Sequence, residues 1–394
     1  MRIEAVIGAN YGDEGKGLFT EYLCRNRPKP LVVLSNGGCQ RGHTVNNPET
    51  GIRHVFHHFG SGTLLKTVPS VYAKTFLLNP IAYVAEKNEL SKLGIPVKAF
   101  RAPGCILQLP CDMFVNQMLE KARGQERHGS CGWGIWETQV RNQWKGRLTF
   151  EDFLGMDYQA RRQCLLESAE WGFCHRLDDV KSQVDYDIME ELMSDEFCDH
   201  FIRDFDDMAK HVKLLETDRL LEVDWGKYEL DIKTLVVENG QGLLLDKTYA
   251  PKDENGEQSV HATPSKTGLE GVIEAIGETD GFGITANYVT RTYFTRHGAG
   301  PFPEHTPGMS FRDETNMPND YQGSMRFGEM TEEYAVSLLM RVMIDSASHA
   351  KFLKERNVVL THCNEMKPNP GVLNEARFSS DSEFSTEITD YGRK

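Results

Sequence analysis

The sequence lacks the features that mark a membrane protein, a nucleic-acid-binding protein or a disulfide-stabilised secreted protein. No apolar run approaches the roughly 20 residues of a membrane-spanning helix. The formal net charge is −14, whereas nucleic acids and anionic membranes attract basic surfaces, so any phosphate must be met by local groups. The nine cysteines show no short paired spacing, and no charged-then-apolar leader precedes the first strand-like run. We therefore expect a protein of the reducing cytoplasm, with no nucleic-acid or membrane partner.

Internal repeats and low-complexity tracts are also missing, and the remaining pattern is typical of an α/β domain. Runs rich in β-forming residues lie at 2–7, 31–34, 235–238, 283–294 and 358–361, with helical stretches between them. This order predicts a large, mostly parallel central sheet that is covered by helices on both faces.

Two other kinds of segment interrupt this pattern. Residues from about 148 to 221 are helix-prone and heavily charged, which predicts a helical subdomain within a single domain of residues 1–394. Residues 253–256 and 302–319 are rich in turn-forming residues, which predicts long loops. Long loops on a rigid scaffold often carry function.

A glycine-rich loop with two acidic residues follows the first strand-like run. Residues 8–17 are GANYGDEGKG and lead into a helical stretch, where backbone N–H groups and a helix N-terminus can face an anion. Lys16 adds a positive charge. A plain glycine-rich turn is the alternative, but adjacent carboxylates repel a phosphate unless one of them binds Mg²⁺ or removes a proton. Asp13 is therefore a candidate for chemistry.

A second glycine cluster, NGGCQRGHT at residues 36–44, follows the next predicted strand. A lone histidine is more often structural. In a glycine-rich loop, however, His43 has few core groups to hydrogen-bond, and it can donate to a developing oxyanion. Together the two loops resemble the adenylosuccinate synthetase family, whose motifs are G-x-x-x-G-D-E-G-K-G and G-G-x-x-x-G-H-T. Asp13, Lys16 and His43 occupy the matching positions. The resemblance implies a core like that of P-loop GTPases.

The resemblance continues in the same order along the chain. Residues 129–135, GSCGWGI, are similar to the family's segment for the nucleotide 5′-phosphate. Residues 238–246, ENGQGLLLD, are similar to the segment whose glutamine contacts the purine, and residues 296–303, RHGAGPFP, to the G-A-G-P-F-P block. Any one of these motifs alone could be a turn, but their common order argues against coincidence.

The resemblance implies a ligase that joins L-aspartate to a purine nucleoside monophosphate, converting IMP to adenylosuccinate through a 6-phosphoryl intermediate. Asp13 is expected to take the proton from purine N1 and, with Gly42, to bind Mg²⁺. His43 is expected to hydrogen-bond the 6-oxygen, while Lys16 neutralises the transferring phosphoryl group. Nucleotide and phosphate contacts are expected from Gly12, Gly15, Gly17, Gln40, Gly42, Thr44, Ser130, Cys131, Arg141, Gln241, Leu245 and Thr263.

Within this set, Arg141 matches an arginine that family members donate across the interface of a homodimer, so the resemblance also implies a dimer. Gln241 is expected to orient the purine base.

The family's arginine-rich aspartate loop, T-T-G-R-R-R, is changed in this chain. The corresponding residues 319–328 are NDYQGSMRFG. Gly323, Ser324 and Arg326 are the expected amino-acid contacts, and Arg326 can pair bidentately with a carboxylate. A substrate dicarboxylate therefore finds fewer positive charges than usual, and a plain surface charge is the alternative role of Arg326.

His362 and Asn364 are the residues expected at the base of the triphosphate donor. Typical members have T-K-x-D, whose carboxylate accepts hydrogen bonds from guanine, whereas residues 361–364 are THCN. Asparagine lacks the charge and both donates and accepts, so strong selection of guanine is not expected. We predict that ATP serves at least as well as GTP.

Three alternatives remain open. Similar changes occur in phage-encoded relatives that act in the host cytoplasm and convert (d)GMP to 2-amino-(deoxy)adenylosuccinate. Retention of Asp13 favours IMP, whereas Asn239 in place of the usual glycine leaves the 2-position undecided. A nucleotide-binding regulator without turnover would not need Asp13, Lys16 and His43 together. A simple P-loop phosphotransferase is disfavoured because Gly17, rather than Ser or Thr, follows the lysine.

Overall fold

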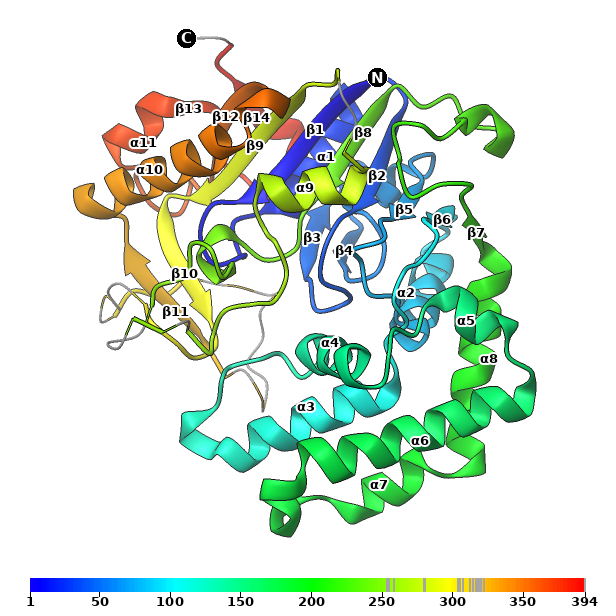
Figure 1. The fold of residues 1–394 in the computed structure, drawn as a ribbon. Helices are drawn as coiled ribbons and strands as arrows, with labels where there is room; N and C mark the ends of the chain where they lie inside the picture. The colour runs from blue at the N-terminus through cyan, green and yellow to red at the C-terminus, as the bar shows by residue number, and fades with distance from the viewer. Residues whose placement is uncertain are drawn as a thin grey trace.

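The computed structural model describes residues 1–252, 256–257, 259–278, 281–302, 306, 308–311, 313, 315, 321 and 323–392. Its centre is a sheet of ten strands in the order β14-β13-β12-β9-β1-β8-β2-β5-β6-β7 (Figure 1). Every neighbouring pair is parallel except β13 and β14, which confirms the predicted sheet. The strands are β1 (Arg2–Gly8), β2 (Pro30–Leu34), β5 (Ser70–Tyr72), β6 (Ala99–Arg101), β7 (Val212–Leu214), β8 (Thr234–Glu238), β9 (Ile284–Arg291), β12 (Leu353–Thr361), β13 (Ala376–Ser380) and β14 (Ile388–Asp390).

The central strands are buried on both faces because successive side chains enter two different cores. Ile3, Ala5 and Ile7 of β1 belong to one hydrophobic cluster, whereas Val6 belongs to another. Helices α9 (Leu269–Ile276) and α10 (Glu332–Ser348) contribute to the first cluster, and α1 (Lys16–Asn26) contributes Phe19 to the second. Strands covered on both faces read as continuous apolar runs, which made them recognisable in the sequence.

The helical part of the chain lies beside the β5–β7 edge of the sheet (Figure 1). Its helices run from residue 110 to residue 211, so the predicted range of about 148–221 omits the first two and includes strand β7. The helices are α3 (Pro110–Arg123), α4 (Ile135–Trp144), α5 (Phe150–Gly155), α6 (Tyr158–Arg176), α7 (Tyr186–Leu192) and α8 (Asp195–His211). Phe153 and Phe205 join the same hydrophobic cluster as Tyr72 of the sheet, so this part is continuous with the main core. Across the described residues, no helix is long and apolar enough to span a bilayer.

Two short hairpins and two helices complete the fold. The hairpins are β3 (His43–Asn46) with β4 (Arg53–Phe56) and β10 (Tyr293–His297) with β11 (Met325–Glu329). Helix α2 (Pro80–Lys92) packs against α8, and α11 (Pro370–Glu375) packs against α10. The predicted β run at 283–294 therefore contains one sheet strand and the start of a hairpin. Of the predicted loops, Asp253, Glu254, Asn255 and most of 302–319 lie outside the described residues.

Candidate active site

The candidate site forms where the central parallel strands end. The carboxyl ends of β1, β2, β8, β9 and β12 lie at one edge of the sheet because these strands are parallel neighbours. In open parallel sheets, ligands bind at this edge. The two predicted glycine loops follow β1 and β2. Residues 239–242 follow β8, and residues 361–364 begin with the last residue of β12. Sequence segments far apart in the chain therefore meet here.

The side chain of Glu14 holds the first glycine loop in shape through hydrogen bonds to other residues of the same loop. Its carboxylate accepts hydrogen bonds from the backbone N–H groups of Asn10 (3.0 Å) and Gly12 (2.7 Å). The ammonium group of Lys16 donates to the Gly12 carbonyl at 2.6 Å and to Glu14 at 3.3 Å. Gly15 has a φ of 88°, and helix α1 begins directly after it. The loop is thus fixed with the first turn of α1 facing the site, as phosphate binding requires.

Asp13 is the acid of this loop that faces the cavity. Burial raises the pKa of Asp13 to about 6, and Glu14 adds to the rise, whereas Arg291 and Lys16 oppose it. The guanidinium of Arg291 hydrogen-bonds the backbone carbonyl of Asp13. A carboxyl group with a pKa near neutrality is suited to exchange a proton with a substrate.

His43 and Glu238 form a buried pair at the start of β3 and the end of β8. Nδ1 of His43 lies 2.8 Å from Oε1 of Glu238, and the hydroxyl and N–H of Ser61 also donate to this carboxylate. Burial lowers the pKa of His43 to about 4 against the opposing effect of Glu238. Burial alone would raise the pKa of Glu238, but His43 and Arg41 outweigh it and lower that pKa. Since an ionised carboxylate only accepts, neutral His43 carries its proton on Nδ1 and presents Nε2 with a lone pair.

A cavity of about 590 Å³ joins the two glycine loops to the end of β12. Besides Asp13, four carboxylates also line it, those of Asp313, Glu365, Asp381 and Glu383. The structure therefore brings together one group of expected residues, namely Gly12, Asp13, Gly15, Lys16, Gly17, Gly42, His43, Thr44, His362 and Asn364.

Gln40, an expected contact of the 5′-phosphate, and Gln241, the expected contact of the purine, lie on two loops that are hydrogen-bonded to each other. Asn36 donates to the carbonyl of Gly240 at 3.2 Å and accepts from its N–H at 2.8 Å. Gln40 accepts from the Gly38 N–H at 2.6 Å, while its Nε2 is buried without a partner. Oε1 of Gln241 is also buried without a partner among the described residues. Buried polar atoms without partners are rare, and a bound ligand would satisfy them.

The expected 5′-phosphate segment packs against the GAG segment of residues 298–300. A Cβ on Gly129 would lie 2.3 Å from the backbone nitrogen of Ala299, so only glycine allows this approach. The next residue, Ser130, exchanges hydrogen bonds with Asn116. Burial raises the pKa of Cys131 to about 11, which keeps its thiol protonated.

Thr263, the second expected phosphate contact, lies on the loop that follows β8. Its backbone N–H donates to the carbonyl of Leu245 at 2.6 Å, which joins these two expected residues directly. Its hydroxyl accepts from the N–H of Ser265 at 3.3 Å.

Arg141 lies in α4 and is buried within its own subunit. Its Nε and one terminal nitrogen bond the two oxygens of Asp112 at 2.8 and 2.9 Å, and that terminal nitrogen also donates to the Leu107 carbonyl at 2.9 Å. Such a bidentate pair gives Arg141 a structural role in this chain. Its role as a phosphate contact across an interface stays a prediction.

Arg326 lies in β11 and donates to the carbonyls of Gly298 (2.6 Å) and Gly300 (3.0 Å). Gly323 accepts a hydrogen bond from Nε2 of His297 at 2.9 Å, and Ser324 is exposed. The loop residues Asn319, Asp320 and Gln322 lie outside the described part of the chain.

The family model described as adenylosuccinate synthetase matches residues 5–318 of this chain. The chain belongs to the adenylosuccinate synthetase family. It is 30% identical over 303 residues to the adenylosuccinate synthetase of Proteus mirabilis, with 76% of this chain and 63% of that protein covered. It is 26% identical over 321 residues to the enzyme of Dehalococcoides mccartyi (strain 195), with 80% and 70% covered. The chain thus spans about two thirds of the length of these relatives.

Two solved structures of this family share the fold. The fully ligated adenylosuccinate synthetase of Plasmodium falciparum is similar with a TM-score of 0.69 and 13% identity, over 100% of both chains. The succinoaminodeoxyadenylate synthetase of cyanophage S-2L, bound to dGMP and to dATP as an energy donor, has a TM-score of 0.61 and 14% identity. That match covers 100% of this chain and 96% of the phage protein.

Sequence reasoning overlooked Glu14, Glu238 and Arg291 in this member of the adenylosuccinate synthetase family. A signal for Glu238 was present, because it ends the apolar run of β8 and a buried charge at such a place requires a partner. Arg291 ends the buried strand β9 in the same way. Glu14 stood beside Asp13, and only the structure distinguishes the inward acid from the one that faces the cavity.

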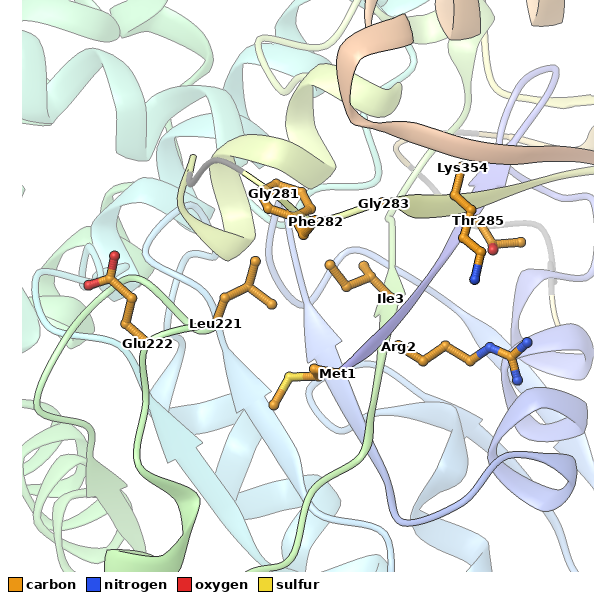
Figure 2. A pocket seen from close by; sticks show the side chains of 10 residues that line it. All are labelled: Met1, Arg2, Ile3, Leu221, Glu222, Gly281, Phe282, Gly283, Thr285 and Lys354. Carbon is orange, nitrogen blue, oxygen red and sulfur yellow. The ribbon is translucent and has the colours of Figure 1, made fainter.

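A second cavity, of about 450 Å³, lies at the opposite edge of the sheet (Figure 2). It is lined near the amino ends of β1, β9 and β12 by Met1, Arg2, Thr285 and Lys354, and by Phe282 from the preceding loop. None of the loops that follow the central parallel strands reaches it. We therefore assign it no part in the site.

Proposed function

We propose that this chain is a C–N ligase that joins L-aspartate to the 6-position of a purine nucleoside monophosphate at the expense of a nucleoside triphosphate. The observation that carries this proposal is the cavity that holds Asp13, Lys16 and His43 together with His362 and Asn364. A binding protein would need the phosphate loop and the base contacts, but not an acid with a raised pKa beside a histidine–carboxylate pair.

The proposed first step is phosphoryl transfer to the purine. Asp13 accepts the N1 proton, and the 6-oxygen then attacks the γ-phosphorus, so that a new P–O bond forms as the bond to the β-phosphate oxygen breaks. Lys16 and the N-terminus of α1 neutralise the triphosphate charge. His43 is neutral in the free protein and takes up a second proton from solvent as the purine anion forms beside it. The purine anion and Glu238 together stabilise this proton, which lets Nε2 donate to the 6-oxygen.

The proposed second step replaces the new leaving group. The 6-oxygen of a purine leaves poorly as oxide or hydroxide, whereas a phosphate ester leaves readily. The amine of aspartate adds to C6 and loses a proton to solvent, and the C6–O bond breaks as inorganic phosphate departs with the 6-oxygen, which gives the succinylamino-purine. Gln40 and Gln241, each with an unpartnered buried polar atom, supply hydrogen bonds to the bound nucleotide.

Mg²⁺ fits the same cavity. Asp13 supplies a carboxylate and Gly42 a backbone carbonyl, which are the hard oxygen ligands that this ion prefers. Among the described residues, none donates a hydrogen bond to the Asp13 carboxylate, so its oxygens are free to bind a cation. When bound, Mg²⁺ supplies charge neutralisation on the phosphoryl group.

IMP is the proposed acceptor, with (d)GMP as the second candidate. Asn239, the residue that replaces the family's usual glycine, is buried and uses both its amide oxygen and its amide nitrogen in hydrogen bonds within the protein. It accepts from Ser35 and donates to the carbonyls of Thr267 (2.8 Å) and Gly268 (3.2 Å). Retention of Asp13 supports IMP, whereas the similarity to a phage enzyme bound to dGMP supports the guanine nucleotide.

One assay tests these proposals. The protein is incubated with Mg-ATP or Mg-GTP, L-aspartate and either IMP or dGMP, and the succinylamino-purine is followed by absorbance. We expect product with IMP, and a rate with ATP at least equal to that with GTP. Nucleotide binding without product under all four combinations would support a regulator, and hydrolysis of the triphosphate alone would support a simple phosphotransferase or NTPase.

We also propose a homodimer, the state that the family resemblance implies. Sedimentation velocity at micromolar concentration tests it, and a monomer at all concentrations would contradict it. Arg141 pairs with Asp112 in its own chain. If Arg141 contacts the phosphate bound by the partner subunit, this pair must break first.

A further inference from the structure

Three arginines from separate elements surround Tyr11 of the first glycine loop. The guanidinium of Arg296, in β10, lies 4.7 Å from the centre of the Tyr11 ring. Arg326 stands directly opposite Arg296 in the β10–β11 hairpin. Arg341, in α10, donates to the side chain of Asn10 at 3.1 Å. Residues far apart in the sequence thus place three positive charges beside the loop that contains Asp13.

No described acidic residue forms an ion pair with these arginines, although the Glu14 carboxylate, already paired with Lys16, attracts Arg341 from further away. Arg296 donates to the carbonyl of Pro301 at 2.7 Å, and the bonds that Arg326 makes to the described part of the chain go to the backbone carbonyls already named. The other donor bond of Arg341 goes to the hydroxyl of Ser337 at 3.0 Å. Arg296 is only 3% exposed, and Nε of both Arg296 and Arg341 is buried without a partner.

This arrangement is unfavourable without an anion. Like charges directly opposite in a strand pair repel, and a buried charge normally has a counter-charge. Burial and the nearby Arg326 lower the pKa of Arg296, and burial lowers the pKa of Arg341 to about 10. Arg326 and Arg341 remain partly exposed, so an anion from solvent can reach them.

We propose that Arg296, Arg326 and Arg341 form the binding site for the two carboxylates of the acidic amino-acid substrate. This inference rests on the proposed ligase function and names the residues that replace the missing arginines of loop 319–328. Guanidinium groups match carboxylates bidentately. Phosphates already have the glycine loops, Lys16 and the N-terminus of α1, so the unneutralised arginines are left for a different anion.

The test is substitution of Arg341, which is partly exposed. Methionine is chosen as the replacement because α10 already contains Met340 and Met343 on either side. In Arg341→Met we expect the KM for L-aspartate to rise roughly tenfold to a hundredfold, because a charge-assisted hydrogen bond is lost. The KM values for the purine nucleotide and for ATP stay within about twofold, a margin far below the loss of a charged contact. Arg341→Lys, which keeps the charge, restores part of the aspartate affinity. Arg219→Met, at an exposed arginine paired with Glu222, is the matched control.

A binding measurement separates this inference from the proposed reaction. Succinate, a dicarboxylate without the amine, should raise the unfolding temperature of the unmodified protein and of Arg219→Met, but much less that of Arg341→Met. Failure to form product with normal succinate binding would reject the ligase function and keep the site. An unchanged aspartate KM and an unchanged succinate effect in Arg341→Met would overturn the site. A rise in the KM for ATP or the purine nucleotide alone would also overturn it, because the arginines would then bind phosphate.

Discussion

At the scale of single residues, the chemistry depends on which of two adjacent acids faces the substrate. Glu14 points into its own loop and accepts two backbone N–H bonds, whereas Asp13 lines the cavity. A raised pKa follows for Asp13 from burial. Asp13, rather than its neighbour Glu14, is therefore the proposed proton acceptor, because only its side chain faces the cavity.

Asp13→Asn should reduce ligase turnover by roughly 10²–10⁴-fold, the usual contribution of a general base, because an amide cannot accept the N1 proton. The unfolding temperature should not fall. A carboxyl whose folded pKa lies above its unfolded value opposes folding when ionised, so its removal relieves that effect at pH 7. Steady-state assay and thermal unfolding measure both. Near-normal turnover in this variant would refute the assignment.

Donor selection also belongs to this scale. Asn364→Asp restores the carboxylate typical of the family, and we expect it to raise the ratio of kcat/KM for GTP to that for ATP by roughly tenfold, since guanine offers two donors to a carboxylate. Competition kinetics with both triphosphates measure the ratio. Asn26→Asp makes the same charge change at an exposed site on α1 and should leave the ratio unchanged. An unchanged ratio in Asn364→Asp would place the donor base elsewhere.

At the scale of elements, the junction between β1 and α1 decides how the phosphate loop is shaped. Gly15 stands at the N-cap of α1 in a left-handed conformation, with a φ of 88°. No side chain caps this helix end, so its N–H groups remain available to a ligand. The left-handed backbone conformation is the reason why glycine is needed at position 15. Lack of space is not the reason, because an added Cβ would lie 3.4 Å from the Thr361 side chain, an ordinary contact distance.

Gly15→Ala should lower the free energy of unfolding by about 1–2 kcal/mol, the cost of a left-handed conformation for a residue with a Cβ. Urea denaturation measures the change, and the KM for the triphosphate should rise as the loop distorts. Gly155→Ala is the control, because Gly155 ends α5 with no positive φ and no atom near the added Cβ. Its stability should stay within about 1 kcal/mol of the unmodified protein. Equal losses in both variants would contradict the backbone explanation.

At the scale of the whole molecule, folding buries His43 and His58 in surroundings that favour their neutral form. His58 is completely buried, donates from Nδ1 toward the hydroxyl of Tyr72 at 3.0 Å and accepts the Asn79 N–H on Nε2 at 3.1 Å. Burial lowers the pKa of His58 to about 3. A second proton would remove the acceptor that Asn79 needs, so the folded state excludes it.

This predicts a specific acid sensitivity. The unfolded chain takes up the His58 proton near pH 6.5 and the folded chain only near pH 3, so stability is lost as pH falls through that window. His58→Gln should reduce the slope of unfolding free energy against pH by up to about 1.4 kcal/mol per pH unit. Urea unfolding at pH 7, 6 and 5 measures it. His200→Gln, at an exposed histidine of α8, should keep the slope, and the same slope in all three proteins would reject the prediction.

Much of the sheet could be predicted because its signal is local. The strands β1, β2 and β8 are short apolar runs that end in glycine loops, and their bounds agree with the predicted runs to within a residue. Strand β12 begins at Leu353 rather than residue 358, because its first half alternates partly buried and exposed positions and carries polar residues. The hairpin β10–β11 was missed because its two strands are separated by a long loop.

The sequence by itself determined the fold class, the two glycine loops and the family, because apolar runs and glycine spacing act over a few residues. Only the tertiary structure decided which side chains meet. His43 and Glu238 are 195 residues apart, and Tyr11 is gathered with arginines at 296, 326 and 341. These partners are chosen by the order of parallel strands, and the physical reason is that pairing across a sheet depends on register in space and leaves no local pattern along the chain.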